Sequence, residues 1–138
     1  MLQRFEKPTS PERNPQSQVQ SYRDLTVWQR AVDLAVECYR ATEAFPKHEL
    51  YGLSAQLQRA AVSVAANIAE GRSRCHTREF LQHLSIAYGS LAELETHIEI
   101  ARRLSYLSAD IAHALHDRCA TLGRMLNGLQ NSVSRRVT

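Results

Sequence analysis

The stretch from Thr77 to Leu104 constrains the fold more than any other part of the chain, because its apolar residues follow a heptad pattern. Alternating steps of four and three residues connect Phe80, Leu84, Ala87, Leu91, Leu94, Ile98 and Ala101. This is the a/d seam of a helix about 40 Å long, with Thr77 predicted as its N-cap. A single helix in water cannot bury such a seam, so the pattern predicts other helices that cover it.

A helix is also predicted before this stretch, from about Asp24 to Ala44. It ends there because Pro46 disfavours helical geometry at Phe45. Three-and-four spacing predicts a buried stripe that ends at Phe45 and consists of Leu25, Trp28, Val32, Ala35, Tyr39 and Thr42 before it. On such a stripe Trp28 is interpreted as a core residue rather than as an aromatic recognition residue.

The next helix is predicted to begin at Glu49 or Ser54 and to end at Glu70, with Gly71 as its C′ residue. Its many alanines allow neighbouring helices to approach closely on more than one side. We therefore expect it to be either the central helix of the monomer or a contributor to a subunit interface.

The last helix is predicted to start after Ser108, a good N-cap, and to fray after Asn131. Short connections between four helices favour antiparallel neighbours, so the predicted fold is all-α, an up-down-up-down antiparallel four-helix bundle. The bundle is assigned to residues 21–134, with a disordered N-terminal tail at 1–20 and a frayed C-terminus at 135–138.

The composition predicts that this bundle is a cytoplasmic protein. Hydrophobic residues make up 43% of the chain, and no run approaches the roughly 20 apolar residues that cross a bilayer, so no membrane association is expected. The cysteines are odd in number, far apart and without CxxC spacing, which indicates reduced thiols: Cys38, Cys75 and Cys119.

Catalytic and metal-binding patterns are not found in the sequence, so we expect a protein that is not an enzyme and has no cofactor. The Glu-x-x-His motif of di-iron bundles does not occur. His113, His116 and Asp117 lie outside the apolar stripe of the last helix, and are interpreted as surface groups rather than metal ligands. Cys75 and His76 are adjacent, but no third group is evident that would orient them as a catalytic pair.

Two polar stripes remain to be explained. One follows the Ala-rich helix at Arg59, Ser63, Asn67 and Glu70, and the other, on the seam helix, comprises Glu93, Glu95 and Glu99. They could form a ligand or partner site. The preferred interpretation is structural: Arg59 pairs with a glutamate of the seam helix, and Asn67 fixes the register of the two helices.

A basic connection joins these two helices and contains Arg72, Arg74 and Arg78, with His76 among them. One interpretation is that it binds RNA or DNA through phosphates, without sequence preference, because no aromatic residue is interleaved to stack on bases. The alternative is that Arg72 and Arg74 cap the C-terminal carbonyls of the preceding helix, while Arg78 pairs with a carboxylate.

The sequence also resembles the four-helix-bundle proteins first noticed as reading frames inside intervening sequences of bacterial 23S rRNA genes. A relative of that family is the accessory protein of diversity-generating retroelements. The resemblance covers about Tyr22 to Leu107, and its most specific element is Asn-Ile-Ala-Glu-Gly at 67–71. The residues that carry it are Asp24–Gln29, Phe45 and Pro46, Gly52–Leu57, Arg59–Ala61, Ser63, Asn67–Gly71, Glu79 and Phe80, Ile86–Ser90 and Glu93–Glu95.

The resemblance implies a bundle that assembles as a homopentamer and has no catalytic residues. For the retroelement relatives it implies binding to reverse transcriptase and to nucleic acid. The chain departs from the family pattern at Gln58, where a second arginine is frequent, and this thins the basic surface. The expected function is a non-enzymatic scaffold or nucleic-acid-associated accessory protein. The alternatives are an adaptor that binds only protein and, third, a metal- or ligand-binding bundle.

Overall fold

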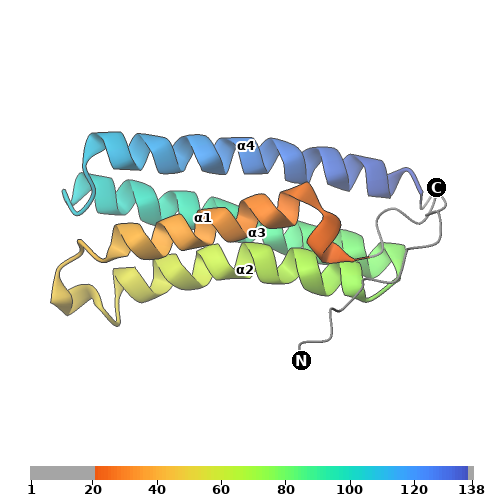
Figure 1. Ribbon diagram of the computed structural model, residues 1–138, viewed down its shortest axis with the longest axis horizontal. Coiled ribbons are helices and arrows are strands. Elements are labelled where there is room, and N and C mark those ends of the chain that lie inside the picture. The colour runs from red at the N-terminus through yellow and green to blue at the C-terminus, as the bar shows by residue number, and fades with distance from the viewer. Residues whose placement is uncertain (1–20, 137–138) are drawn as a thin grey trace, which may run out of the picture.

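The computed structural model of the protein describes residues 21–136, and over this range the fold is an all-α four-helix bundle, as predicted (Figure 1). The predicted disordered tail at 1–20 lies outside the described residues. The elements are η2 (Tyr22–Asp24), α1 (Thr26–Thr42), η3 (Lys47–Glu49), α2 (Leu53–Ser73), α3 (Thr77–Arg103) and α4 (Ala109–Ser134). No helix within residues 21–136 combines the length and the apolar character that crossing a membrane requires.

The four helices surround one core, and each packs against two neighbours. The connections lie at alternating ends of the bundle, so consecutive helices run in opposite directions (Figure 1). The neighbouring pairs are α1 with α2, α2 with α3, α3 with α4, and α4 with α1. The face formed by α1 and α2 therefore lies on a different side of the bundle from the face formed by α3 and α4.

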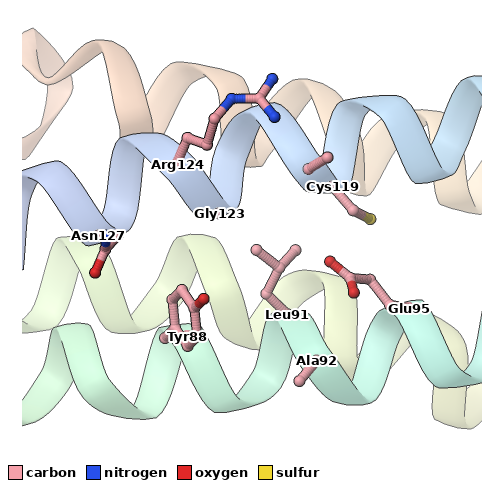
Figure 2. Close-up of a pocket in the computed structure, with 9 residues that line it drawn as sticks. Tyr88, Leu91, Ala92, Glu95, Cys119, Gly123, Arg124 and Asn127 are labelled. Atoms are coloured by element: carbon pink, nitrogen blue, oxygen red, sulfur yellow. The ribbon is translucent and has the colours of Figure 1, made fainter.

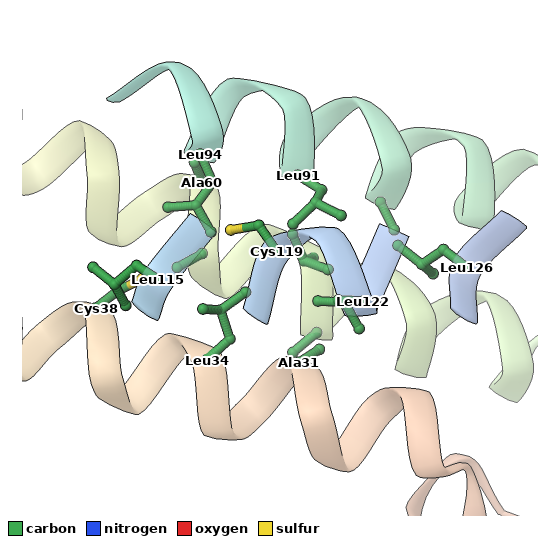
Figure 3. Packing of buried hydrophobic residues seen from close by; sticks show 14 of the residues in the cluster. Ala31, Leu34, Cys38, Ala60, Leu91, Leu94, Leu115, Cys119, Leu122 and Leu126 are labelled. Atoms are coloured by element: carbon green, nitrogen blue, oxygen red, sulfur yellow. The ribbon is translucent and has the colours of Figure 1, made fainter. Parts of the chain in front are cut away.

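The heptad seam of α3 occupies the centre of the core. All seven of its predicted residues are buried, and Leu84, Leu94 and Ile98 are completely inaccessible. Leu115, Cys119, Leu122 and Leu126 of α4 pack in the same cluster (Figure 3). The prediction that other helices cover the seam is thus confirmed.

The stripe predicted for α1 is wrong by about one residue. The buried residues of α1 are Val27, Ala31, Leu34, Cys38 and Thr42, of which only Thr42 was predicted. Figure 3 shows Ala31, Leu34 and Cys38 in the core. Trp28, Val32 and Ala35 are half-buried beside the core, and Tyr39 is 47% exposed. The helix has two neighbouring apolar stripes, and the one with smaller side chains faces the core because it fits closer to α4 and α2.

Helix ends follow the predicted chemistry at one site and differ at others. Ser108 is the N-cap of α4, and its Oγ accepts from the Ile111 amide at 3.2 Å. Thr77 is not the N-cap of α3: His76 holds that position, with no side-chain capping bond. The fourth helix extends beyond Asn131 to Ser134 and is completed by bonds from the Arg135 and Arg136 amides.

The Gly71 prediction is also wrong, because this residue lies inside α2 rather than after its end. A Cβ at this position would lie 2.6 Å from Cβ of His83 and 3.2 Å from Cδ1 of Phe80. Gly71 therefore serves the close approach of α2 to α3. The residue with left-handed backbone after α2 is Cys75, at φ 62°.

Candidate functional site

The basic connection lies at the end of the bundle where α2 passes into α3. Arg72 is half-buried in the last turn of α2, Arg74 forms its C-cap, and Arg78 is exposed in the first turn of α3. The structure thus brings all three predicted arginines to one short turn, where Cys75 and His76 are also exposed.

Nearby carboxylates reduce the positive charge of this turn. The Arg74 guanidinium donates to Oε1 of Glu70 at 2.9 Å, and this hydrogen bond lowers the pKa of Glu70. Glu79 lies in the first turn of α3 and adds a second negative charge. The predicted capping by the Arg74 side chain is not observed, because its guanidinium contacts the Glu70 side chain, and only the main-chain amide of Arg74 bonds the Glu70 carbonyl. Arg78 forms no ion pair with any residue between 21 and 136. Two carboxylates therefore oppose three arginines, and Arg78 keeps its charge open to solvent.

Farther along α2 and α3, away from this turn, a line of polar side chains forms hydrogen bonds between the two helices. Nδ2 of Asn67 donates to the Ser63 carbonyl at 2.9 Å and to the Ser63 hydroxyl at 3.1 Å. Oδ1 of Asn67 lies 3.1 Å from Nδ1 of His83, which must therefore carry the hydrogen and donate it. The Ser63 hydroxyl lies 2.8 Å from that of Ser90. These bonds support the interpretation that Asn67 fixes the register of the two helices.

The sequence prediction identified the α2 half of this line and missed the α3 half. His83 and Ser90 are seven residues apart, so they lie on one face of α3, and this spacing was the available signal. The predicted pairing of Arg59 with a glutamate of α3 is wrong within the subunit: Arg59 is exposed and forms no ion pair with residues 21–136. Glu93 instead lies 3.4 Å from the buried His97 ring, and Glu95 faces α4.

An apolar groove runs between α1 and α2 on the outside of the bundle. It encloses about 530 Å³. Its lining includes Trp28, Val32, Ala35, Val36, Tyr39, Val62, Ala65 and Ala66. Val36, Tyr39 and Val62 are each more than 40% exposed, so large apolar side chains on both helices remain in contact with solvent. Four of its α1 residues are ones that the sequence pattern assigned to the buried stripe: Trp28, Val32, Ala35 and Tyr39.

A smaller pocket of about 250 Å³ lies between α3 and α4 (Figure 2). Leu91 lies in the gap between the helices, and Gly123 of α4 carries no side chain there. The Glu95 carboxylate projects from α3 toward α4 beside Cys119, whereas the guanidinium of Arg124 points away from the gap (Figure 2). Glu95 is half-buried and has no ion-pair partner in residues 21–136.

The remaining reactive groups are held apart. Burial raises the pKa of the Cys38 and Cys119 thiols to about 12, which keeps both protonated. His113 is exposed and lies 3.5 Å from Asp117, while His116 lies 3.7 Å from Glu99. Within residues 21–136, no three His, Cys, Asp or Glu side chains come close enough together to hold a metal ion.

These features define a helical bundle in which polar side chains form hydrogen bonds between α2 and α3. The surfaces it offers to a partner are the apolar groove between α1 and α2 and the basic turn between α2 and α3. Residues 23–128 match the family described as 23S rRNA-intervening sequence protein, and the chain belongs to that family. This confirms the resemblance drawn from the motifs above.

One solved structure supports the fold. It is a protein of unknown function from the S23 ribosomal protein family of Bacteroides thetaiotaomicron VPI-5482. It superimposes with a TM-score of 0.70 at 20% identity, covering 76% of this chain and 95% of that one. A comparison with curated proteins found no match.

Proposed function

We propose that the protein is a non-enzymatic homo-oligomeric scaffold in the cytoplasm, assembled as a ring of five subunits. The observation that carries this proposal is the α1–α2 groove, whose floor and walls are almost entirely apolar. A contiguous apolar surface of this kind marks an interaction site, because leaving it in water is unfavourable. The number five rests on the family resemblance alone.

Association of subunits would also change the electrostatics of the basic turn. A ring repeats Arg72, Arg74 and Arg78 once per subunit around one rim. A modest excess of positive charge in each copy then becomes a concentrated field that attracts phosphates. We propose that this rim binds RNA or DNA without sequence preference, and that the scaffold serves a nucleic-acid-associated partner such as a reverse transcriptase.

Light scattering of the purified chain tests the assembly. We expect a single species of five subunits at micromolar concentration. The variant Val62→Glu, which places a charge on the rim of the groove, should shift this species toward monomer, whereas Ser85→Glu on the exposed surface of α3 should not. A monomeric parent protein would refute the scaffold proposal.

A gel-shift with mixed-sequence RNA and duplex DNA tests the rim. The parent should retard both at low salt, and the affinity should fall steeply as salt is raised because phosphate contacts release counterions. The triple Arg→Gln variant at 72, 74 and 78 should lose the shift. No shift by the parent would leave the second candidate, a protein-binding adaptor. That candidate is favoured by the exposed Leu50 and Tyr51 at the opposite end of the bundle.

A further inference from the structure

Two unpaired charges of opposite sign lie on different sides of the bundle. Arg59 of α2 is exposed and lies three residues before Val62, so it borders the apolar groove between α1 and α2. Glu95 of α3 lies in the pocket between α3 and α4. Neither has an ion-pair partner within the part of the chain that the structure describes.

The surroundings of Glu95 suit the side chain of an arginine. The pocket has an apolar floor at Leu91, small residues at Ala92, Ala120 and Gly123, and the Tyr88 ring and Asn127 at its edge. An arginine could lay its methylenes on the apolar floor and bring its planar guanidinium to the carboxylate in a bidentate arrangement. A half-buried carboxylate gains more from such a partner than an exposed one does, because less water screens the pair.

We propose that the α3–α4 pocket of one subunit receives Arg59 from a second copy of the chain, which docks through its α1–α2 groove. This inference rests on the proposed self-association and names the two faces that meet. It also explains why the arginine that the sequence pattern pairs with a glutamate of α3 finds no such partner in its own subunit: the pair forms in trans.

Charge complementarity identifies a second copy as the occupant. The groove carries Arg40, which pairs with Glu37 of its own helix, Glu43 on its lining and Arg59 at its border. The pocket carries Glu95, while the guanidinium of Arg124 points away from the gap (Figure 2). The exposed Arg59 of one face can thus meet an unpaired carboxylate on the other. Because the two faces lie on different sides of the bundle, their contact is head-to-tail and leaves every subunit a free groove or a free pocket for the next copy. Such an interface closes into a ring when the rotation between copies allows it.

Charge reversal at the two positions tests the pair, with sedimentation velocity as the readout over a range of protein concentrations. Arg59→Glu and Glu95→Arg should each raise the dissociation constant for self-association at least about tenfold, because like charges then meet at the interface. The double variant Arg59→Glu/Glu95→Arg should restore the parent constant to within about threefold, because the pair is re-formed with its signs exchanged. Far-UV circular dichroism confirms that each variant keeps its helices.

Glu93→Arg is the matched control, since it makes the same charge change two residues away on α3, at a position that contacts His97 of its own helix. It should leave the dissociation constant unchanged. If Glu93→Arg weakens assembly as much as Glu95→Arg, or if the double variant fails to recover, the pair in trans is refuted. Unchanged association of both single variants also refutes it, and the groove is then covered in another way. A monomeric parent, in contrast, refutes the proposed self-association itself.

Discussion

Gly71→Ala tests whether α2 and α3 approach as closely as the structure describes. In a helix interior, replacing glycine by alanine ordinarily stabilises a protein by about 1 kcal/mol. Here the new Cβ would lie 2.6 Å from Cβ of His83. Carbon atoms pack at roughly 3.5–4.0 Å, so the helices must separate locally by about 1 Å.

The cost of that separation exceeds the gain in helix propensity. Overpacking of this kind costs about 1–3 kcal/mol. A shift of the His83 backbone also weakens the 3.1 Å hydrogen bond to Asn67, which is worth about 1 kcal/mol. We therefore expect Gly71→Ala to lower the free energy of unfolding by about 1–3 kcal/mol net.

Urea unfolding followed by circular dichroism at one fixed protein concentration measures this change. Gly128→Ala is the control, because it lies in α4 with nothing within 4 Å of the added Cβ. It should stabilise by up to about 1 kcal/mol. If Gly71→Ala stabilised the protein as Gly128→Ala does, the close contact between α2 and α3 would not exist.

Three further substitutions and one labelling experiment probe the rest of the fold. Leu94→Ala removes a completely buried seam residue and should lower the unfolding free energy by about 2–5 kcal/mol in urea titrations; a change below about 0.5 kcal/mol would contradict its central position. Ser105→Gly should raise the free energy of unfolding by up to about 1 kcal/mol in thermal unfolding experiments, because Ser105 holds φ 61° at the end of α3. A lower free energy of unfolding would show that the serine side chain is needed there. Hydrogen bonds from two arginines lower the pKa of Glu99 to about 2, so its contribution to stability is present above the ordinary value of 4.5 and is lost as the pH falls from 4.5 toward 2. Glu99→Gln should flatten the acid limb of the stability profile in that window, and an unchanged limb would exclude the contribution. An alkylating reagent at neutral pH should label Cys75 alone in the native protein, with mass spectrometry as the readout, because the other two thiols are buried; labelling of all three would indicate an open core.

The sequence predicted the four helices from their apolar spacing. It predicted the α3 seam correctly because one heptad pattern repeats without a break along α3, and only one face of that helix is apolar along its whole length. It failed on α1 because that helix has two apolar stripes with the same three-and-four spacing. Periodicity cannot decide which of Trp28 and Val27 faces the core, since this depends on how closely α2 and α4 approach. Gly71 was misplaced for a related reason. A glycine near the end of a helical pattern predicts a C′ residue as well as a close helix contact, and only the position of α3 distinguishes them.

In the candidate site, the sequence predicted the cluster of arginines but not the partners of Asn67 and Arg59. The three arginines lie within seven residues of the sequence, so their proximity needed no tertiary information. The partner of Asn67 lies sixteen residues away on another helix, and the choice of His83 over its neighbours depends on helix register. The partner assigned to Arg59 was wrong within the subunit because spacing along α2 does not show which side of the bundle a side chain faces.

The hydroxyl pair of Ser63 and Ser90 has a consequence for how chains of this fold can diverge. Exchanging Ser63 for alanine leaves the half-buried Ser90 hydroxyl without this partner, which is unfavourable. Exchanging Ser90 is less costly, because the Ser63 hydroxyl still accepts from the Asn67 amide. An apolar residue at position 63 should therefore occur among homologues only where position 90 is apolar as well.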